Sequence, residues 1–225
     1  MGRYSVGIET KNKILAEAKT LFYEQGFNNT SFLDIGKAAE VNKALITYHF
    51  KNKNNLAKEI FFEFSRNQQK ACDSVLACEH GAVAAITSLM LFYKLIMEDE
   101  NLKRFWYDIA VADVISDMLF WEEEVFLKKI ASSLNISVPE DELFTIYCIE
   151  NGMEIELIKN IFLGNIKEPI DSVFEKQYKV TLSLLGVYGK EAQEIIQKSF
   201  DTAKEIKAER KGYFEVEYTR AFLIK

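Results

Sequence analysis

The feature that most constrains the fold is the segment of residues 30–56, which reads TSFLDIGKAAEVNKALITYHFKNKNNL. Ser31 is a favourable residue at the start of a helix, and Asp34, three positions later, completes a capping-box pattern. After a break at Val41, Asn42 is a good cap for a second short helix. The segment therefore predicts two short helices joined by a tight turn, which is the arrangement of a helix-turn-helix.

Two helices of about two turns each are not stable alone, so the segment needs a packing partner. Residues 10–26 supply one, because Thr10 can cap a helix, Gly26 can end it, and five apolar residues recur between them at helical spacing: Ile14, Leu15, Ala18, Leu21 and Phe22. The last of the three helices buries Leu45, Ile46 and Phe50 and turns Lys43, Ala44, Thr47 and Tyr48 outward. We expect a three-helix unit whose third helix projects.

The chain from Lys13 to Leu56 resembles the tetracycline-repressor (TetR) family of transcriptional regulators. The residues that carry the resemblance agree at fixed spacing over more than forty positions and include Ile14-Leu15, Ala18, Leu21-Phe22, Gly26-Phe27, Thr30-Ser31, Asp34-Ile35, Ala39, Val41, Tyr48-His49-Phe50, Lys53 and Leu56. The resemblance implies a helix-turn-helix DNA-binding domain at 1–52 and a larger helical domain at 53–225 that binds a ligand and dimerises.

Two positions depart from the family pattern. Glu40 stands in the turn where members usually carry glycine, and that position often needs a positive φ angle. Thr47 stands where members often carry an aromatic residue, so we expect a different DNA contact there. Neither residue belongs to the predicted core, so the predicted fold is unaffected.

Charge is distributed unevenly along the chain. Residues 1–70 hold eleven Lys and Arg against seven Asp and Glu, whereas the remainder holds 17 against 27. A basic amino-terminal part on an acidic body fits a DNA-binding head. With no apolar run long enough to span a bilayer and no signal peptide at the start, we expect a cytoplasmic protein.

The remainder of the chain is expected to be helical, because the whole chain of 225 residues contains only two prolines and ten glycines. We predict an all-α fold, with helices after the head at 53–76, 82–97, 102–115, 117–134, 139–163, 169–185 and 190–211. Residues 212–225 stay open, since Phe214, Val216 and Tyr218 alternate with glutamates like a strand, yet Phe214, Tyr218 and Phe222 are also spaced like a helix.

We assign the predicted DNA contacts residue by residue. Lys43, Ala44 and Thr47 are candidates for base edges, and Tyr48, His49 and Lys53 for backbone phosphates. Thr30 and Ser31 are expected at phosphates beside the second helix, and Asn42 at the start of the third. For His49 the alternative is a packing role behind the third helix.

A ligand site is expected among the aromatic residues of 90–126 and on the helix 139–163. There Glu150 and Glu154 share a stripe with Leu143 and Tyr147, and a buried carboxylate needs a partner. One interpretation turns the stripe to solvent or to lysines at a dimer interface; another aims a carboxylate at a cationic ligand, with cation–π support from a tryptophan. The predicted ligand residues are Phe92, Met97, Phe105, Trp106, Asp108, Trp121, Tyr147, Glu150 and Glu154.

These patterns and the resemblance together predict a homodimeric regulator. The helices 139–163 and 169–185 are apolar on more than one face and are the expected dimer interface, and a dimer places two recognition helices on a pseudo-palindromic operator. A small-molecule effector would release this repressor from DNA. The alternative is a dimeric DNA-binding protein without a ligand, which acts through partner recruitment or as an activator.

Catalysis is not expected. Neither GxSxG, HExxH nor a phosphate-binding glycine loop occurs, and the chain has two histidines, so we predict neither a metal nor a cofactor. Cys72, Cys78 and Cys148 lack CxxC spacing, so ordinary thiols are favoured over a Cys72–Cys78 redox pair.

Overall fold

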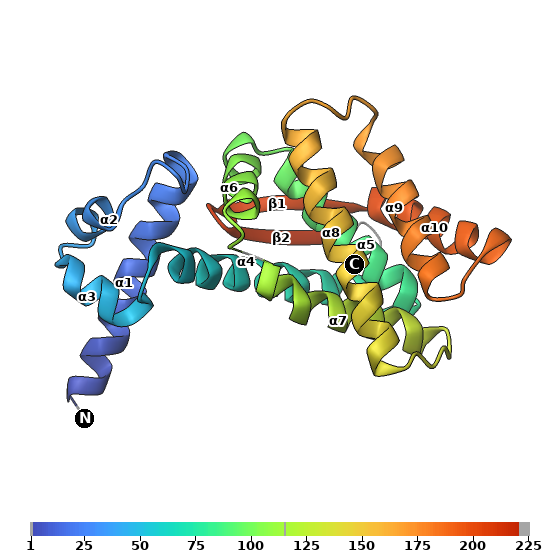
Figure 1. Ribbon diagram of the computed structural model, residues 1–225, viewed down its shortest axis with the longest axis horizontal. Coiled ribbons are helices and arrows are strands. Elements are labelled where there is room, and N and C mark those ends of the chain that lie inside the picture. Colours follow the sequence, from blue (N-terminus) through green and yellow to red (C-terminus); the bar gives the residue numbers. More distant parts are fainter. Residues whose placement is uncertain (1, 115, 221–225) are drawn as a thin grey trace.

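The computed structural model describes the backbone of residues 2–114 and 116–220, and the side chains of residues 7–114 and 125–220. Three helices form a head at one end of the molecule: α1 (Gly2–Glu24), α2 (Phe32–Ala38) and α3 (Lys43–Phe50). Figure 1 shows α4 (Lys53–Leu76) leaving this head and crossing into a larger helical body. The first helix begins at Gly2 rather than at Thr10, so Thr10 is not its cap.

The predicted caps of α2 and α3 are confirmed. Ser31 and Asp34 form a capping box, and the side chain of Asn42 accepts a hydrogen bond from the Leu45 N–H. Ile46 and Phe50 are buried and Leu45 is half-buried. Glu40 has a φ of 54°, which is the left-handed conformation that glycine adopts most easily. The turn therefore has the predicted positive φ although its residue is a glutamate.

The body consists of α5 (Gly81–Met97), α6 (Glu100–Val111), α7 (Ser116–Ser133), α8 (Glu140–Phe162), α9 (Ile170–Leu184) and α10 (Gly189–Lys204). The helix α5 is largely buried and packs against α4, α6, α7 and α10. The predicted helices agree with these bounds closely, except that α6 ends four residues early, where Asp113 has a φ of 53°.

One prediction about secondary structure was wrong. The helix expected at 190–211 ends at Lys204, and an antiparallel hairpin follows, made of β1 (Ile206–Gly212) and β2 (Glu215–Arg220). Local propensity favours a helix at 206–211, but pairing with β2 and packing of β2 on α4 override it. The segment left open is thus a strand up to Arg220. The fold class remains all-α with this small sheet.

A continuous core joins the head to the body. Its head members include Ile14, Ala18 and Phe22, and its body members include Ile86, Met90 and Trp106. Among the described residues, no single helix has the length and hydrophobicity of a membrane span; α5 and α6 reach them only as a pair bent by 106°.

Candidate functional site

The outward face of α3 exposes side chains that could contact DNA. Lys43, Ala44, Thr47 and Tyr48 are exposed, and Tyr48 keeps 80% of its accessible surface. The Thr47 hydroxyl donates to the Lys43 carbonyl at 3.0 Å, which leaves its methyl group and oxygen lone pairs outward. A basic, a small and a hydroxyl side chain on one projecting face suit the major groove of DNA.

Two predicted DNA residues have internal partners instead of an open surface. Thr30 is buried at 1% exposure, and its hydroxyl donates to the Gly26 carbonyl at 2.8 Å, so the prediction of a phosphate contact by this side chain needs correction. Lys53 donates to the carbonyls of Phe27 and Thr30 at 2.8 and 3.1 Å. Burial lowers the pKa of its ammonium group, and the Asp108 carboxylate opposes that effect.

The remaining head residues lie around the same surface. Ser31 and Asn42 are exposed at the starts of α2 and α3, where both side chains are engaged as caps. His49 is half-buried, and its ring lies 5.1 Å from that of Tyr48 and 6.1 Å from that of Phe50. This position is compatible with either interpretation of His49.

A cavity of about 440 Å³ lies in the body between α4, α5, α6, α7 and α8. Five aromatic side chains form much of its wall: Phe62, Phe92, Tyr93, Trp106 and Phe126. Its rim is exposed and carries Arg66, Gln69, Asp73 and Val125. A cavity of this size that combines aromatic walls with polar side chains is compatible with a small-molecule site.

Three of the polar side chains that line the cavity are buried: Gln68, Ser88 and Glu154. Glu154 is 2% exposed and contributes a carboxylate from α8, opposite the aromatic wall of α5 and α6. The indole N–H of Trp106 is buried and has no hydrogen-bond partner among the described residues. Gln68 bridges α4 to α5 by donating to the Ser88 carbonyl at 3.0 Å. The cavity thus combines a carboxylate acceptor, an indole donor and aromatic faces.

The cavity brings together only part of the predicted ligand set. Phe92, Trp106 and Glu154 line it. Residues of α4 were not predicted, although Gln68 was detectable as a polar side chain on the otherwise apolar stripe of Phe61, Phe64 and Cys72. Other predicted residues lie elsewhere, and the side chain of Trp121 is outside the described residues.

Asp108 and Phe105 face the head rather than the cavity, which corrects their predicted role. Both oxygens of Asp108 accept from Asn28, at 2.8 Å from the side-chain amide and 3.3 Å from the backbone N–H. The Phe105 ring stacks on Phe22 of α1 at 5.9 Å. Met97, at the end of α5, does not line the cavity either.

Glu150 is buried one turn from Glu154 on α8, so this stripe faces the interior of the body and not solvent. Burial raises the pKa of Glu150 to about 7, whereas a hydrogen bond with Thr181 acts in the opposite direction. One of its oxygens has no hydrogen-bond partner among the described residues. Neither Glu150 nor Tyr147 lines the cavity. Glu150 nevertheless places a carboxyl group with a raised pKa one helical turn from Glu154, which does line it.

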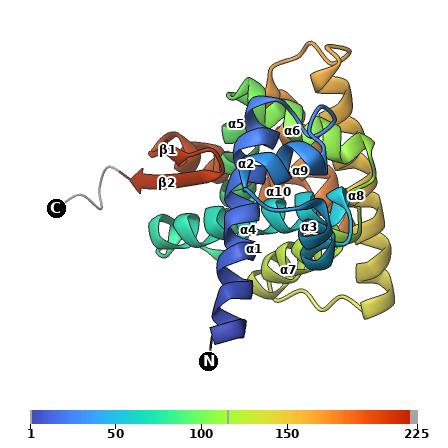
Figure 2. The same ribbon diagram turned by 90° about the vertical axis from the view of Figure 1, so that its left-hand side faces the viewer.

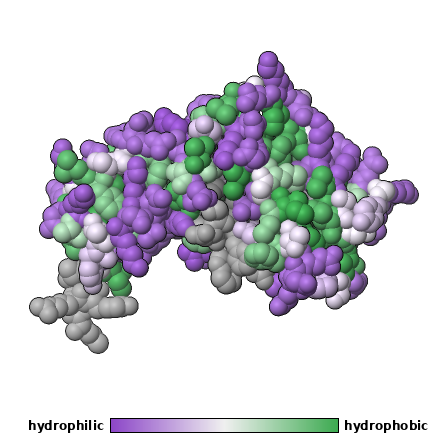
Figure 3. Space-filling model, viewed as in Figure 1, coloured by the Kyte–Doolittle hydropathy of each residue, from purple (hydrophilic) through white to green (hydrophobic). Residues whose placement is uncertain are grey.

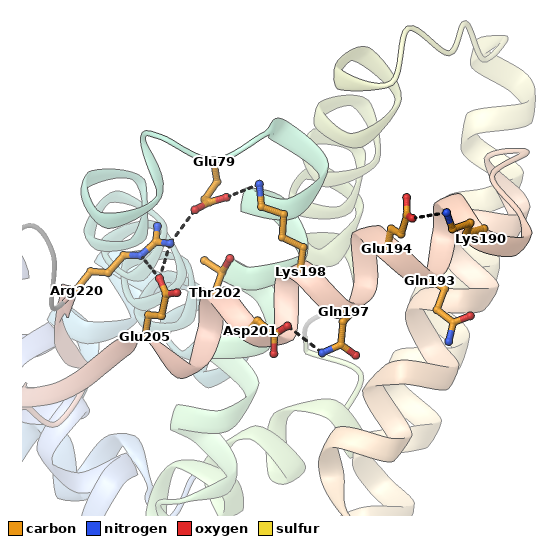
Figure 4. Close-up of a pocket in the computed structure, with 10 residues that line it drawn as sticks. All are labelled: Glu79, Lys190, Gln193, Glu194, Gln197, Lys198, Asp201, Thr202, Glu205 and Arg220. Atoms are coloured by element: carbon orange, nitrogen blue, oxygen red, sulfur yellow. Dashed lines mark hydrogen bonds and ion pairs between the residues drawn. The ribbon is translucent and has the colours of Figure 1, made fainter.

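The structure also contains a charged groove along α10 and three free cysteines. A groove of about 620 Å³ along α10 is lined by charged side chains that pair with one another, as Figure 4 shows for Lys198 with Glu79. No group of three or more potential metal-binding side chains occurs within the described parts of the chain. Burial raises the pKa of Cys72 to about 12, which disfavours its reactive thiolate, while Cys78 is exposed.

Residues 14–60 match the sequence model described as "Bacterial regulatory proteins, tetR family". The chain is 29% identical over 128 residues to the probable transcriptional regulator YttP of Bacillus subtilis, and the match spans 53% of this chain and 62% of YttP. It is 40% identical over 70 residues to the transcriptional regulator QacR of Staphylococcus aureus, across 31% of this chain and 37% of QacR. The chain therefore spans less than two thirds of either relative.

The whole fold is similar to solved structures. The crystal structure of RolR in complex with resorcinol superposes with a TM-score of 0.65 and 19% identity, covering 86% of this chain and 96% of that one. At this identity the likeness concerns the fold, including the helical body. The family model thus matches the sequence of the head, and the solved structure matches the fold of head and body together.

Proposed function

We propose that the chain is a member of the tetR family of bacterial regulatory proteins and acts as a DNA-binding transcriptional repressor that a small molecule releases from its operator; the match of residues 14–60 supports this proposal. The single observation that carries the proposal is one chain holding both a projecting α3 face and a separate aromatic cavity lined by α4. Its relatives are named as regulators and not as enzymes.

On DNA, α3 lies in the major groove. Lys43 reaches guanine or a phosphate, and Ala44 and Thr47 contact thymine methyl groups or other base edges. Ser31, Asn42 and Tyr48 lie at the backbone around this helix. Lys53 has three ammonium protons and uses two on the loop carbonyls, so one remains for a phosphate beside the start of α4.

The protein acts as a homodimer through α8 and α9. Phe144 and Ile149 of α8, Leu163 at its carboxyl-terminal cap and Val180 of α9 are exposed, with 40% or more of their surface accessible. Figure 3 shows hydrophobic side chains gathered on the face of the body where α8 and α9 lie in Figure 1. Contact between two such faces buries them and presents two heads to a two-fold operator.

The ligand is a small aromatic molecule that carries a hydrogen-bond donor. An aromatic hydroxyl matches the cavity best, because it can donate to Glu154 and accept from the Trp106 indole. RolR, whose fold is similar, binds resorcinol in the structure of that name. The cationic ligand that the glutamates suggest stays a prediction, since a protonated amine would also satisfy the carboxylate.

Regulation follows from α4, which begins beside α3 and lines the cavity with Phe62 and Gln68. A ligand that fits better when α4 is tilted stabilises heads spaced wrongly for successive major grooves. The ligand must bind this arrangement more tightly than the DNA-bound one, or it shifts nothing. The cavity supports this view over the alternative of a regulator without a ligand.

The ligand proposal is tested by thermal stabilisation with two panels, neutral phenols and aromatic cations. We expect a phenol to raise the melting temperature of the protein, and Glu154→Gln to abolish the rise. Glu156→Gln is the matched control, because Glu156 lies on α8 but is exposed and paired with Lys159. Stabilisation by cations alone would replace the phenol with a cation, and stabilisation by neither panel would favour the regulator without a ligand.

A further inference from the structure

The hairpin β1–β2 follows α4 from the body to the head. β2 runs beside the carboxyl-terminal half of α4, with Phe214 packed on Phe64 near its start and Arg220 bonded to the Val75 carbonyl near its end. In Figure 1 both strands run alongside α4 across the body with their turn toward the head, and Figure 2 shows them on one flank of the molecule. The hairpin therefore lies alongside α4, the helix that connects the head to the body.

The base of the hairpin is fixed to the body. Arg220 is only 4% exposed, and its guanidinium pairs with Glu79 at 2.8 Å and with Glu205 at 2.7 Å. Glu79 also pairs with Lys198 of α10 at 3.1 Å, so the network joins β2, α10 and the residues that follow α4 (Figure 4). Buried ion pairs with several partners hold a defined geometry.

The turn of the hairpin contacts the head. Tyr213 donates to Glu24 at 2.8 Å, and its ring lies 4.7 Å from that of Tyr23. The guanidinium of Arg210 lies over the Tyr23 ring and bonds to both the Tyr23 hydroxyl and the Asp99 carboxylate. We call this set of contacts the tip contact; it joins the end of α1 to β1 and to the cap of α6.

Phe214 completes the junction from inside. It is 2% exposed, and its ring lies 5.1 Å from Phe105 of α6, 5.6 Å from Phe64 of α4 and 6.3 Å from Tyr23 of α1. One side chain of the hairpin thus touches the head, the connecting helix and the body together.

We propose that the hairpin fixes the orientation of the head relative to the body, acting through the tip contact in addition to α4 and to the contacts that α6 makes with the head. A single helix can bend between Lys53 and Phe64, but a head held also at Tyr23 and Glu24 cannot rotate without breaking those contacts. Its importance for regulation rests on the proposed function, because a ligand-driven tilt of α4 must then release or displace the tip contact. The role of the hairpin in holding the head can be tested without DNA or ligand, and so separately from the proposed function.

The experiment measures the distance between head and body by pulsed electron paramagnetic resonance on the full-length protein. One spin label is attached at Lys37→Cys in α2 and one at the native, exposed Cys78, in a Cys148→Ser background. Cys72 is buried, and its raised pKa, about 12, protects it from labelling. Labelled chains are diluted with excess unlabelled chains so that only distances within a chain contribute.

The test variant is Arg210→Ala with Tyr213→Ala, and Lys211→Ala is the control, because Lys211 pairs only on the hairpin surface with Glu209 and Glu217. We expect one narrow distance distribution for the parent and the control, and a broadened or displaced one for the double variant. Tyr213→Phe, which removes only the bond to Glu24, gives a smaller change of the same kind. Identical distributions in all four proteins would overturn the proposal, whether or not the protein binds DNA.

Discussion

At the scale of single residues, Glu40 shows how a sequence departure becomes a structural strain. The turn of the helix-turn-helix needs a positive φ, and Glu40 adopts 54° in spite of its side chain. Its carboxylate pairs with Lys13 at 2.7 Å, and this pair holds the pKa of Glu40 below its usual value. The pair is exposed, so it compensates little of the backbone strain.

We predict that Glu40→Gly raises the melting temperature by about 2 °C, because glycine adopts this conformation without a steric penalty. Differential scanning calorimetry measures the change. Glu40→Gln separates the two effects, since it removes the ion pair but keeps the strain, and it should leave the melting temperature nearly unchanged. A lower melting temperature for the glycine variant would show that the ion pair matters more than the backbone.

Glu150 predicts a pH dependence of stability. Burial raises its pKa from 4.5 to about 7, so between these values the folded state binds more protons than the unfolded state. The contribution of Glu150 to the free energy of unfolding therefore falls as pH rises from about 4.5 to 7 and is level above that range. Glu150→Gln should remove this fall and stabilise the protein at pH 8 by on the order of 3 kcal/mol.

Urea denaturation at pH 5 and pH 8 measures this difference, with Glu156→Gln as the exposed control. Equal gains from Glu150→Gln at both pH values would mean that packing, and not protonation, is responsible. Sequence alone identified the two glutamates of α8 but left their orientation open, because α8 is apolar on more than one face. Only packing against neighbouring helices decides which face of the helix is buried.

At the scale of elements, the helices were predictable where the chain carries local stop and start signals. Asn52 caps α4 at its predicted start, Pro139 and Pro169 precede α8 and α9, and Gly164 follows α8. Only the β2 half of the hairpin had a signal in the sequence, the alternation at Phe214, Val216 and Tyr218. The residues of β1 favour a helix locally and become a strand through pairing with β2, which packs on the distant α4. Asp108 was misplaced for the same reason, since its partner Asn28 is eighty residues away.

The base of the hairpin gives a prediction at this scale. Arg220→Met leaves Glu79, whose side chain is 9% exposed, with Lys198 as its remaining partner and should cost about 2 kcal/mol of stability by chemical denaturation. Lys207→Met, at an exposed position of β1, is the control. Adding Glu79→Gln to Arg220→Met should recover part of the loss. No recovery would mean that the arginine acts through packing alone.

At the scale of the whole molecule, the head and the body differ in net charge and in the kind of side chain that they expose. The basic head exposes α3 at one end, and the apolar surface of α8 and α9 lies on the body. The sequence predicted this division, and the family match of residues 14–60 agrees with its head. The lining of the aromatic cavity comes from five helices that meet in the body. The sequence therefore identified only three of the residues that line it.

The central claim is that two heads of a dimer read a two-fold DNA site through α3. Selection of bound sequences from random double-stranded DNA tests it most directly, with the native protein and with Thr47→Ala in parallel. The account predicts an enriched inverted repeat for the native protein and an altered half-site for Thr47→Ala, at the base pairs under that residue. Enrichment of no sequence, or of a site without two-fold symmetry, would contradict the account.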